Sequence, residues 1–267
     1  EDARKTHGDR RPHGRGGGNC TTLIKSRLVE GDAYGLEGLC NWDEPMDPSA
    51  EAPAIVNRYG YRIAGVHNLG DKAVLLSLES YEKANRESSI VDKRFAIDHG
   101  LMISQDNIKQ AAELGAMWSL QPFLLHDITP TIAQVWGEEV AQRWTMPTRS
   151  LIDGGVKITY GADRWSDPKR NPMWGLEILV TRLASNGTVY GPGEKLDRAT
   201  VLLMMTRWGA EYVLREKDLG SLEPGKLADL IVLDRNPLDR SIPDEDLSEI
   251  KVVTTLVGGQ VAYGSLN

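Results

Sequence analysis

Three histidines follow short apolar segments, at the points where strands would end. His67 closes the run RIAGVH, His99 directly follows RFAID, and His126 lies a few residues beyond AMWSLQ. Asp163 follows VKITYG in the same way. Imidazoles and a carboxylate brought to one place are suitable ligands for a divalent metal ion that activates water. A histidine that ends a strand is more often only hydrogen-bonded structure, so the spacing by itself leaves both interpretations open.

The elements that would position these residues follow a simple alternation. From Thr21 onward, short β-branched or apolar runs alternate with helix-like stretches, which is typical of βα units and a parallel sheet. In a parallel barrel, residues that end consecutive strands converge on one rim. Five strands are predicted, over residues 22–29, 62–67, 94–98, 116–121 and 156–161.

The stretches between the strands carry helix signals. Ser104 is a suitable N-cap for a helix that runs to Leu114, and Gly115 stands where a left-handed residue would end it. Other helices are predicted over 72–86, from Thr129 or Thr131 to Trp144, over 173–184 and over 196–214.

The pattern changes after about residue 219. A short strand is predicted over 229–234, and residues 251–257 are joined to 260–263 by Gly258 and Gly259, a link suited to a tight hairpin turn. The sequence therefore predicts a small β element after the βα region.

Composition excludes some classes of function. With 38 acidic and 31 basic residues the net charge is −7, which disfavours binding to nucleic acid. No apolar run is long enough for a membrane span. The two cysteines, Cys20 and Cys40, have no metal-binding spacing, and a cytoplasmic location is expected. Residues 1–19 are polar and rich in Arg and Gly, which predicts a flexible tail, and the chain begins at Glu1 rather than Met, as a processed or partial chain would.

Several segments resemble the amidohydrolase superfamily. LGSLEPGKLADLIVLDRNP, at residues 219–237, with the later TTLVGGQVAY, is similar to the C-terminal signature of that superfamily. The segments VHNLGDKAV, RFAIDHGLMISQDNIKQAAELGAMWSLQPF and TYGADRWSDP resemble the branch that includes N-substituted formamide deformylases. The resemblance covers most of the chain from about residue 55 onward.

The resemblance implies roles for individual residues. His67 and His99 would end the fifth and sixth barrel strands and bind a divalent metal, with zinc expected. Asp163, after the eighth strand, would bind the same metal and accept a proton from the water that attacks an amide-like carbonyl. Lys25 is a candidate bridging ligand, although its spacing to Glu30 is one residue longer than the family pattern.

The sequence indicates substrate-binding residues less specifically than metal ligands. Gln121, His126 and Trp165 are candidates for binding a small amide-like substrate. Each also has a structural interpretation. Gln121 would stand at a turn, His126 would be a loop histidine held by the backbone, and Trp165 would be a packing residue.

One departure from the family concerns the first metal-binding strand, since no His-x-His pair occurs in these 267 residues. Removing the tail, 1–19, and the β element, 219–267, leaves residues 20–218, too few for a closed barrel of about 250 residues. The expected fold is α/β, a partial (β/α)8 TIM-type barrel of about strands four to eight, with C-terminal strands of a small β-sandwich. Its open sheet edges predict a homo-oligomer or completion by a missing N-terminal half.

Two functions therefore remain open. The first is a metal-dependent hydrolase that acts on carbon–nitrogen bonds other than peptide bonds, as a fragment or an incomplete form. The second is a catalytically inactive truncated barrel that acts only in binding or assembly. Absence of the His-x-His pair favours the inactive barrel for the isolated chain. The presence of His67, His99 and Asp163 favours a metal-dependent hydrolase as the protein from which the chain descends.

Overall fold

A four-stranded parallel sheet organises the computed structural model, which describes residues 48–163 and 170–266. The strands lie in the order β1-β2-β3-β4, each parallel to its neighbour. They are β1 (His67–Asn68), β2 (Ala96–His99), β3 (Met117–Leu120) and β4 (Lys157–Tyr160). The predicted parallel α/β arrangement is therefore confirmed, although β1 keeps only the last residue of the predicted strand 62–67. The predicted strand 22–29, Lys25 and Trp165 lie outside the described residues.

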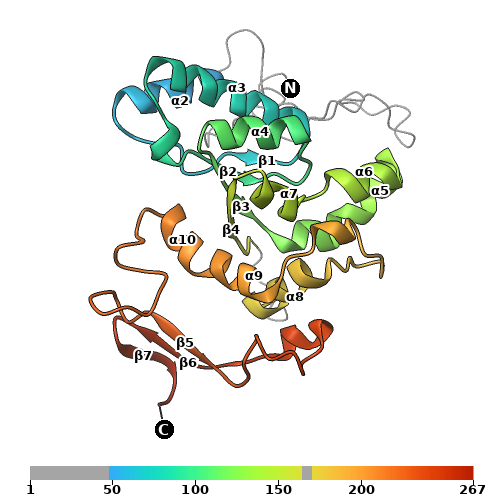
Figure 1. Cartoon of the computed structure of the whole chain (residues 1–267), viewed down its shortest axis with the longest axis vertical. Helices are drawn as coiled ribbons and strands as arrows, with labels where there is room; N and C mark the ends of the chain where they lie inside the picture. Colours follow the sequence, from blue (N-terminus) through green and yellow to red (C-terminus); the bar gives the residue numbers. More distant parts are fainter. Residues whose placement is uncertain (1–47, 164–169, 267) are drawn as a thin grey trace, which may run out of the picture.

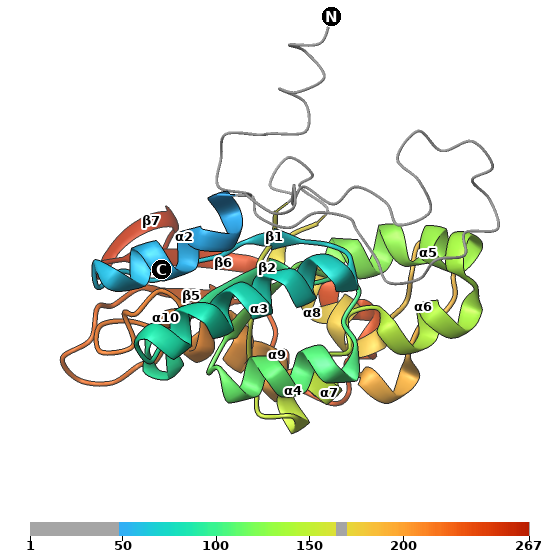
Figure 2. The same ribbon diagram turned by 90° about the horizontal axis from the view of Figure 1, so that it is seen from above.

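Helices lie on both sides of this sheet (Figures 1 and 2). On one side, α3 (Asp71–Glu87) packs against α2 (Pro48–Arg58) and α4 (Gln105–Glu113). On the other, β4 packs against α9 (Arg198–Met205) and α10 (Arg207–Tyr212). The remaining helices are α5 (Thr129–Trp136), α6 (Glu138–Trp144), α7 (Thr148–Asp153), α8 (Pro172–Thr181), the π-helix η2 (Leu124–Ile128) and the 3-10 helices η1 (Val91–Lys93), η3 (Pro192–Glu194) and η4 (Asp244–Glu249).

The start of α4 confirms its predicted cap. The Ser104 side chain accepts from the Asn107 backbone N–H at 3.2 Å, and the Asn107 side chain accepts in return from the Ser104 N–H at 3.2 Å. Gly115, just past the helix, has a φ of +62°. The boundaries follow from hydrogen bonds between near neighbours in the chain, which is why they could be predicted.

Two long predicted helices are each divided. The stretch toward Trp144 breaks at Gly137, whose φ of 96° ends α5 and starts α6. The stretch 196–214 breaks at Thr206, where φ is −123° and ψ −88°, between α9 and α10. The predicted helix 173–184 ends early because Arg182 adopts a left-handed conformation with a φ of 57°. Apolar spacing continues across these breaks, so the pattern alone did not locate them.

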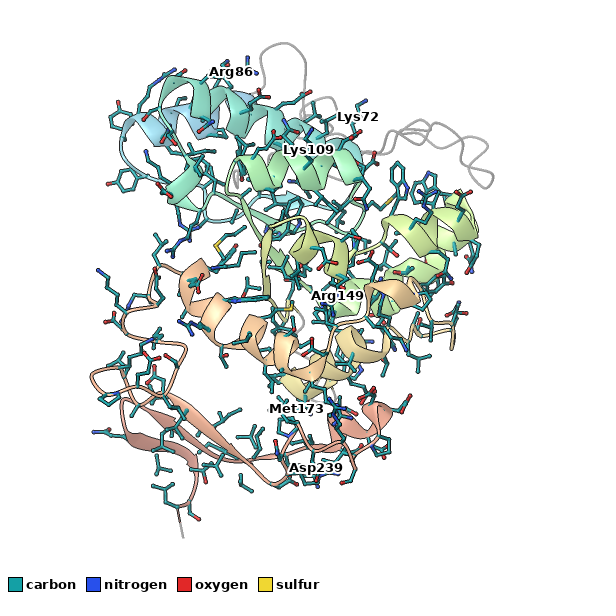
Figure 3. All side chains as sticks on the ribbon, viewed as in Figure 1. Lys72, Arg86, Lys109, Arg149, Met173 and Asp239 are labelled. Atoms are coloured by element: carbon teal, nitrogen blue, oxygen red, sulfur yellow. The ribbon has the colours of Figure 1, made fainter. Side chains whose placement is uncertain are left out.

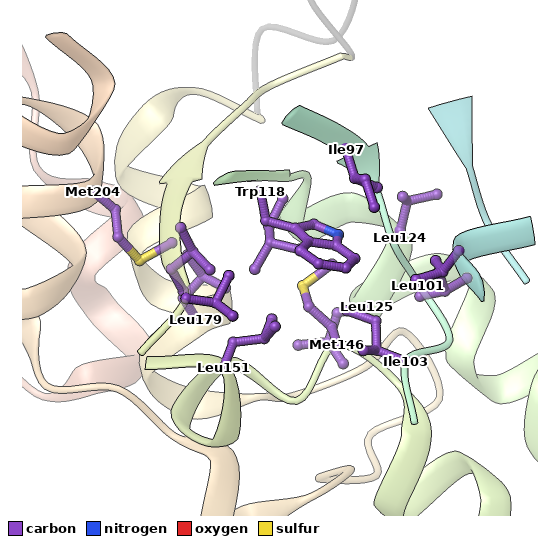
Figure 4. Close-up of a cluster of buried hydrophobic side chains, with 14 of the residues drawn as sticks. Ile97, Leu101, Ile103, Trp118, Leu124, Leu125, Met146, Leu151, Leu179 and Met204 are labelled. Atoms are coloured by element: carbon purple, nitrogen blue, oxygen red, sulfur yellow. The ribbon is translucent and has the colours of Figure 1, made fainter. Parts of the chain in front are cut away.

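Trp118 lies at the centre of the apolar core (Figure 4). It pairs in register with Ile97 on β2 and Ile158 on β4, and all three are fully buried. Leu125 and Met146 are buried in the same cluster. This apolar face holds the strands in place, and burying each such side chain stabilises the fold by about 1.5–3 kcal/mol.

A three-stranded antiparallel sheet follows, at the C-terminal end of the chain (Figure 1). It is formed by β5 (Leu230–Leu233), β6 (Val252–Val257) and β7 (Gln260–Gly264). The predicted hairpin is confirmed, since Gly258 and Gly259 link β6 to β7 with φ values of 57° and 79°. Large apolar side chains are exposed on all three strands, namely Ile231, Val232, Val253, Val257, Val261 and Tyr263.

Charged side chains occupy the outer helices; Figure 3 labels Lys72 and Arg86 on α3 and Lys109 on α4. None of the helices within residues 48–163 and 170–266 combines the length and apolar character that a membrane span requires.

Candidate metal and active site

One face of the parallel sheet carries a row of polar side chains. In register, His67 on β1 pairs with Asp98 on β2, Asp98 with Ser119 on β3, and Ser119 with Thr159 on β4. Because residues at paired positions point to the same side of a sheet, these four side chains share a face. The row is opposite to the face that carries Trp118, since alternate residues along a strand point in opposite directions.

His99 joins this face through an unusual backbone conformation. Regular alternation would direct His99 away from the side of Asp98. Its φ of 71°, in the left-handed region, ends the strand regularity and allows the imidazole to reach back. His67 Nδ1 and His99 Nε2 are 2.6 Å apart, and the two rings meet edge to face with centroids 4.6 Å apart. The predicted pair of histidines is therefore brought together, and local strain contributes to it.

Gln121 connects the imidazole pair to the carboxylate of Asp98. Its Oε1 lies 2.7 Å from His99 Nδ1, and its Nε2 donates to Asp98 Oδ1 at 3.2 Å and to Ser119 Oγ at 3.0 Å. Gly161 leaves space for this amide, because a Cβ there would lie 2.7 Å from Gln121 Nε2. His99 and Gln121 are buried, whereas the His67 side chain is 43% exposed, so solvent reaches the pair at His67.

The two imidazole nitrogens stand closer together than two ligands of one metal ion would. Two ring nitrogens 2.6 Å apart are within hydrogen-bond distance, with one donating to the other. Tetrahedral zinc ligands would stand about 3.3 Å apart, so a small separation of the rings would let an ion replace the proton between them. A bond from the second ring nitrogen to an amide oxygen, as His99 makes to Gln121, is the usual support of a metal-binding histidine.

Asp163 does not complete a three-ligand cluster. It is exposed, with a φ of 48°, and it follows β4, two strands away from β2. Neighbouring strands are about 4.8 Å apart, so its backbone starts about 10 Å from the His99 strand. Within the described residues, no three His, Cys, Asp or Glu side chains lie close enough together to hold a metal ion.

His126 belongs to a separate polar cluster beyond the ends of β3 and β4. Its Nδ1 lies 2.7 Å from Asp127 Oδ1, and its ring meets Trp174 edge to face at 5.3 Å. Arg170 donates to both oxygens of Asp127, at 2.5 and 3.1 Å, and stacks 5.0 Å over Trp174. His126 lies within η2, and its ring is held by the Asp127 carboxylate rather than by a backbone group; its main-chain carbonyl accepts from the Ser185 N–H. A substrate contact through His126 stays a prediction.

The Asp127–Arg170 pair gives a pH-dependent contribution to stability. Burial raises the pKa of Asp127, but the hydrogen bonds from Arg170 and His126 outweigh it, and the net pKa is lowered. The unfolded chain therefore binds this proton more tightly, so the contribution is present above the ordinary pKa of 3.8 and is lost as the pH falls through the folded value.

We expect Asp127→Asn to lower the free energy of unfolding by about 1.5–3 kcal/mol at pH 7, because hydrogen bonds to a charged group are lost. The difference from the wild type should shrink below pH 3.8, as measured by urea unfolding across pH. Asp153→Asn, at an exposed position on α7, serves as the charge control. A difference that stays constant down to pH 2 would contradict the expected linkage.

Asp98 and Ser119 are residues of this site that the sequence pattern did not identify. A signal was present, since a polar residue follows a buried apolar residue at the same register position in each of β2, β3 and β4. Their alignment depends on strand register, which the sequence does not reveal without the sheet.

A cavity of about 720 Å³ lies away from this site, between α9 and the segment that precedes η4. Leu196, Arg198 and Ile242 line it, and neither His67 nor His99 does. The polar face of the sheet, rather than this cavity, therefore holds the candidate chemistry.

Comparison with known proteins identifies the family. A sequence model described as the amidohydrolase family matches residues 37–263. The chain belongs to the amidohydrolase family. The family predicted from the C-terminal signature is therefore confirmed, and the imidazole pair lies within the matched part of this amidohydrolase chain.

Two curated relatives extend over most of this amidohydrolase chain. The protein LONG AFTER FAR-RED 3 from Arabidopsis thaliana is 28% identical over 250 residues, which are 92% of this chain and 41% of the relative. The N-substituted formamide deformylase from Arthrobacter pascens is 28% identical over 209 residues, 78% of this chain and 37% of that enzyme. The chain thus spans about two fifths of the length of these relatives.

Solved structures agree with the family assignment. A metal-dependent hydrolase of uncharacterized function from Pyrococcus furiosus is 29% identical, with a TM-score of 0.58 over 71% of this chain and 37% of its own. Another from Pyrococcus horikoshii has a TM-score of 0.65 at 21% identity, over 84% of this chain and 42% of its own. The second likeness concerns the fold alone.

Proposed function

We propose that this chain is the C-terminal portion of a metal-dependent hydrolase that acts on carbon–nitrogen bonds other than peptide bonds in small amide-like substrates. The observation that carries the proposal is the His67–His99 pair, with nitrogens 2.6 Å apart at the ends of adjacent parallel strands. The named activities of similar proteins, a formamide deformylase and a metal-dependent hydrolase, support the same class of reaction.

In this proposal, β1 to β4 correspond to strands five to eight of a (β/α)8 barrel, and β5 to β7 belong to a small β-sandwich. The parallel order of the four strands and the ends of β1, β2 and β4 at one rim support this correspondence. A second copy of the chain, or an N-terminal half, would cover the edges of β1 and β4, which pair with no further strand within residues 48–163 and 170–266.

His67 and His99 would hold the metal, with zinc the proposed ion. Asp163, which stands apart from the pair in this structure, would have to approach it to serve as a third ligand. When bound, such an ion supplies a water of lowered pKa and polarises a carbonyl. Gln121 holds the ring of His99 in place, and the exposed carboxylate of Asp163 is suited to accept a proton at the rim.

The alternative is a truncated barrel that has no catalytic activity and acts only in binding or assembly. It is favoured by one observation, that no three potential ligands come together within residues 48–163 and 170–266. The exposed apolar side chains of β5 to β7 are compatible with an assembly role.

Zinc titration of the metal-free chain, followed by calorimetry and elemental analysis, tests the proposal. We expect the wild type to bind one equivalent of zinc, and His67→Ala or His99→Ala to weaken binding by at least about 100-fold, because each removes one of a few ligands. His126→Ala, which removes an imidazole outside the pair, should bind zinc as the wild type does. Absence of stoichiometric zinc from the wild-type chain would favour the inactive alternative.

A further inference from the structure

Asp98 has no role in the site proposed so far, although it stands at its centre. It immediately precedes His99 and lies opposite His67 in the register of β1 and β2. Its Oδ1 accepts from Gln121 Nε2 at 3.2 Å, and its Oδ2 lies 3.9 Å from His67 Nε2. The carboxylate is partly exposed, at 26%, and lies beside the backbone of Gly65.

The carboxylate determines which end of the Gln121 amide faces His99. The NH₂ of Gln121 faces Asp98 and donates to its Oδ1, since the carboxylate oxygens serve as hydrogen-bond acceptors. The carbonyl oxygen then points to His99 Nδ1, which must carry the proton in order to donate. In a neutral imidazole this leaves His99 Nε2 with its lone pair, directed at His67 Nδ1.

Ser119, the other partner of Gln121 Nε2, does not fix the orientation of the Gln121 amide. A hydroxyl can donate or accept, so Ser119 would satisfy the amide in either orientation. Among the contacts of Gln121 in the described structure, only the one with Asp98 excludes the flipped amide.

We propose that Asp98 is a positioning residue that acts through the Gln121 amide to hold His99 as the Nδ1–H tautomer. Its effect is to keep the Nε2 lone pair directed toward His67. The consequence for metal binding rests on the function proposed above, whereas the tautomer itself does not. Outer groups that orient a metal-binding histidine typically change affinity by about 10–100-fold when they are removed.

Nitrogen NMR of chains labelled with ¹⁵N-histidine tests the tautomer directly, without metal and at a pH where the ring is neutral. The chain has five histidines, and His99→Ala assigns the signal of interest. We expect a protonated Nδ1 and an unprotonated Nε2 in the wild type. Asp98→Asn, which is isosteric, should give averaged shifts from a mixture of tautomers, because an amide at this position accepts either orientation of Gln121. Ser119→Ala should keep the wild-type signal.

A double variant should restore the Nδ1–H tautomer of His99. Gln121→Glu combined with Asp98→Asn places acceptor oxygens toward both His99 and the new amide, so the Nδ1–H tautomer should return. A wild-type signal in Asp98→Asn alone, or a wild-type chain with the proton on Nε2, would overturn the proposal.

Zinc affinity separates this inference from the proposed function. We expect Asp98→Asn to bind zinc about 10–100-fold more weakly than the wild type, with Asp92→Asn on η1 as an exposed charge control. Unchanged affinity in Asp98→Asn, beside normal zinc binding by the wild type, would overturn the inference and leave the proposed function standing. If the wild type binds no zinc, the proposed function fails, and the NMR signal of His99 still decides the role of Asp98.

Discussion

Replacing the buried Arg182 with methionine is expected to lower the free energy of unfolding by about 3–5 kcal/mol. Arg182 caps the end of α8 and has no exposed surface. Its guanidinium donates to the carbonyl oxygens of Tyr190 at 2.6 Å, Met146 at 2.9 Å and Thr145 at 2.8 Å. Burial lowers the pKa of Arg182 to about 10, so the side chain stays charged at neutral pH.

The size of the effect follows from what the substitution leaves behind. Methionine fills a similar volume but donates no hydrogen bond, so the carbonyl oxygens of Tyr190 and Thr145 lose this donor inside the protein. The Met146 oxygen keeps a second donor, the Thr148 N–H at 2.8 Å. Each buried acceptor without a partner costs about 1–3 kcal/mol, and the loss of a charge-assisted bond to Met146 adds to the two costs. Urea unfolding measures the change, with Arg207→Met at an exposed position of α10 as the control. A loss below about 1 kcal/mol would show that water takes over the role of the guanidinium.

Gly100→Ala should destabilise the protein by about 2–5 kcal/mol, the second large effect. Gly100 has a φ of 56°, which costs an alanine about 1–2 kcal/mol. An added Cβ would also lie 1.8 Å from Nε1 of the fully buried Trp118. Trp118 is held in the middle of the core (Figure 4), so relief of this clash requires movement of the strands, at about 1–3 kcal/mol.

Gly60→Ala separates the cost of the backbone conformation from the cost of the clash. Gly60 has a φ of 78° but no atom within 4 Å of an added Cβ. We expect Gly60→Ala to lower the free energy of unfolding by the conformational cost alone, about 1–2 kcal/mol. Equal losses in the two variants, measured by thermal and urea unfolding, would be evidence that the core accommodates the methyl group. Since Gly100 follows His99, the first variant should also disturb the imidazole pair, which histidine NMR can detect.

The sequence alone determined the elements that depend on neighbours along the chain. Ser104 and Gly115 mark the ends of α4, and Gly258 with Gly259 makes the hairpin turn between β6 and β7, because caps and tight turns are made by residues a few positions apart. The C-terminal signature at 219–237 is long enough to indicate the family by its residues alone. His67 and His99 were found because each ends a recognisable apolar strand.

Only the tertiary structure decided how distant residues meet. Strand register aligns Asp98 with His67 and Ser119, and no pattern within one strand specifies that alignment. The left-handed backbone at His99 brings its ring onto the polar face, and the strand order keeps Asp163 apart, two strands from β2. Arg182 reaches carbonyl oxygens up to 37 residues away. Such contacts depend on the packing of whole elements, so their energies cannot be read from the residues on either side of each position in the chain.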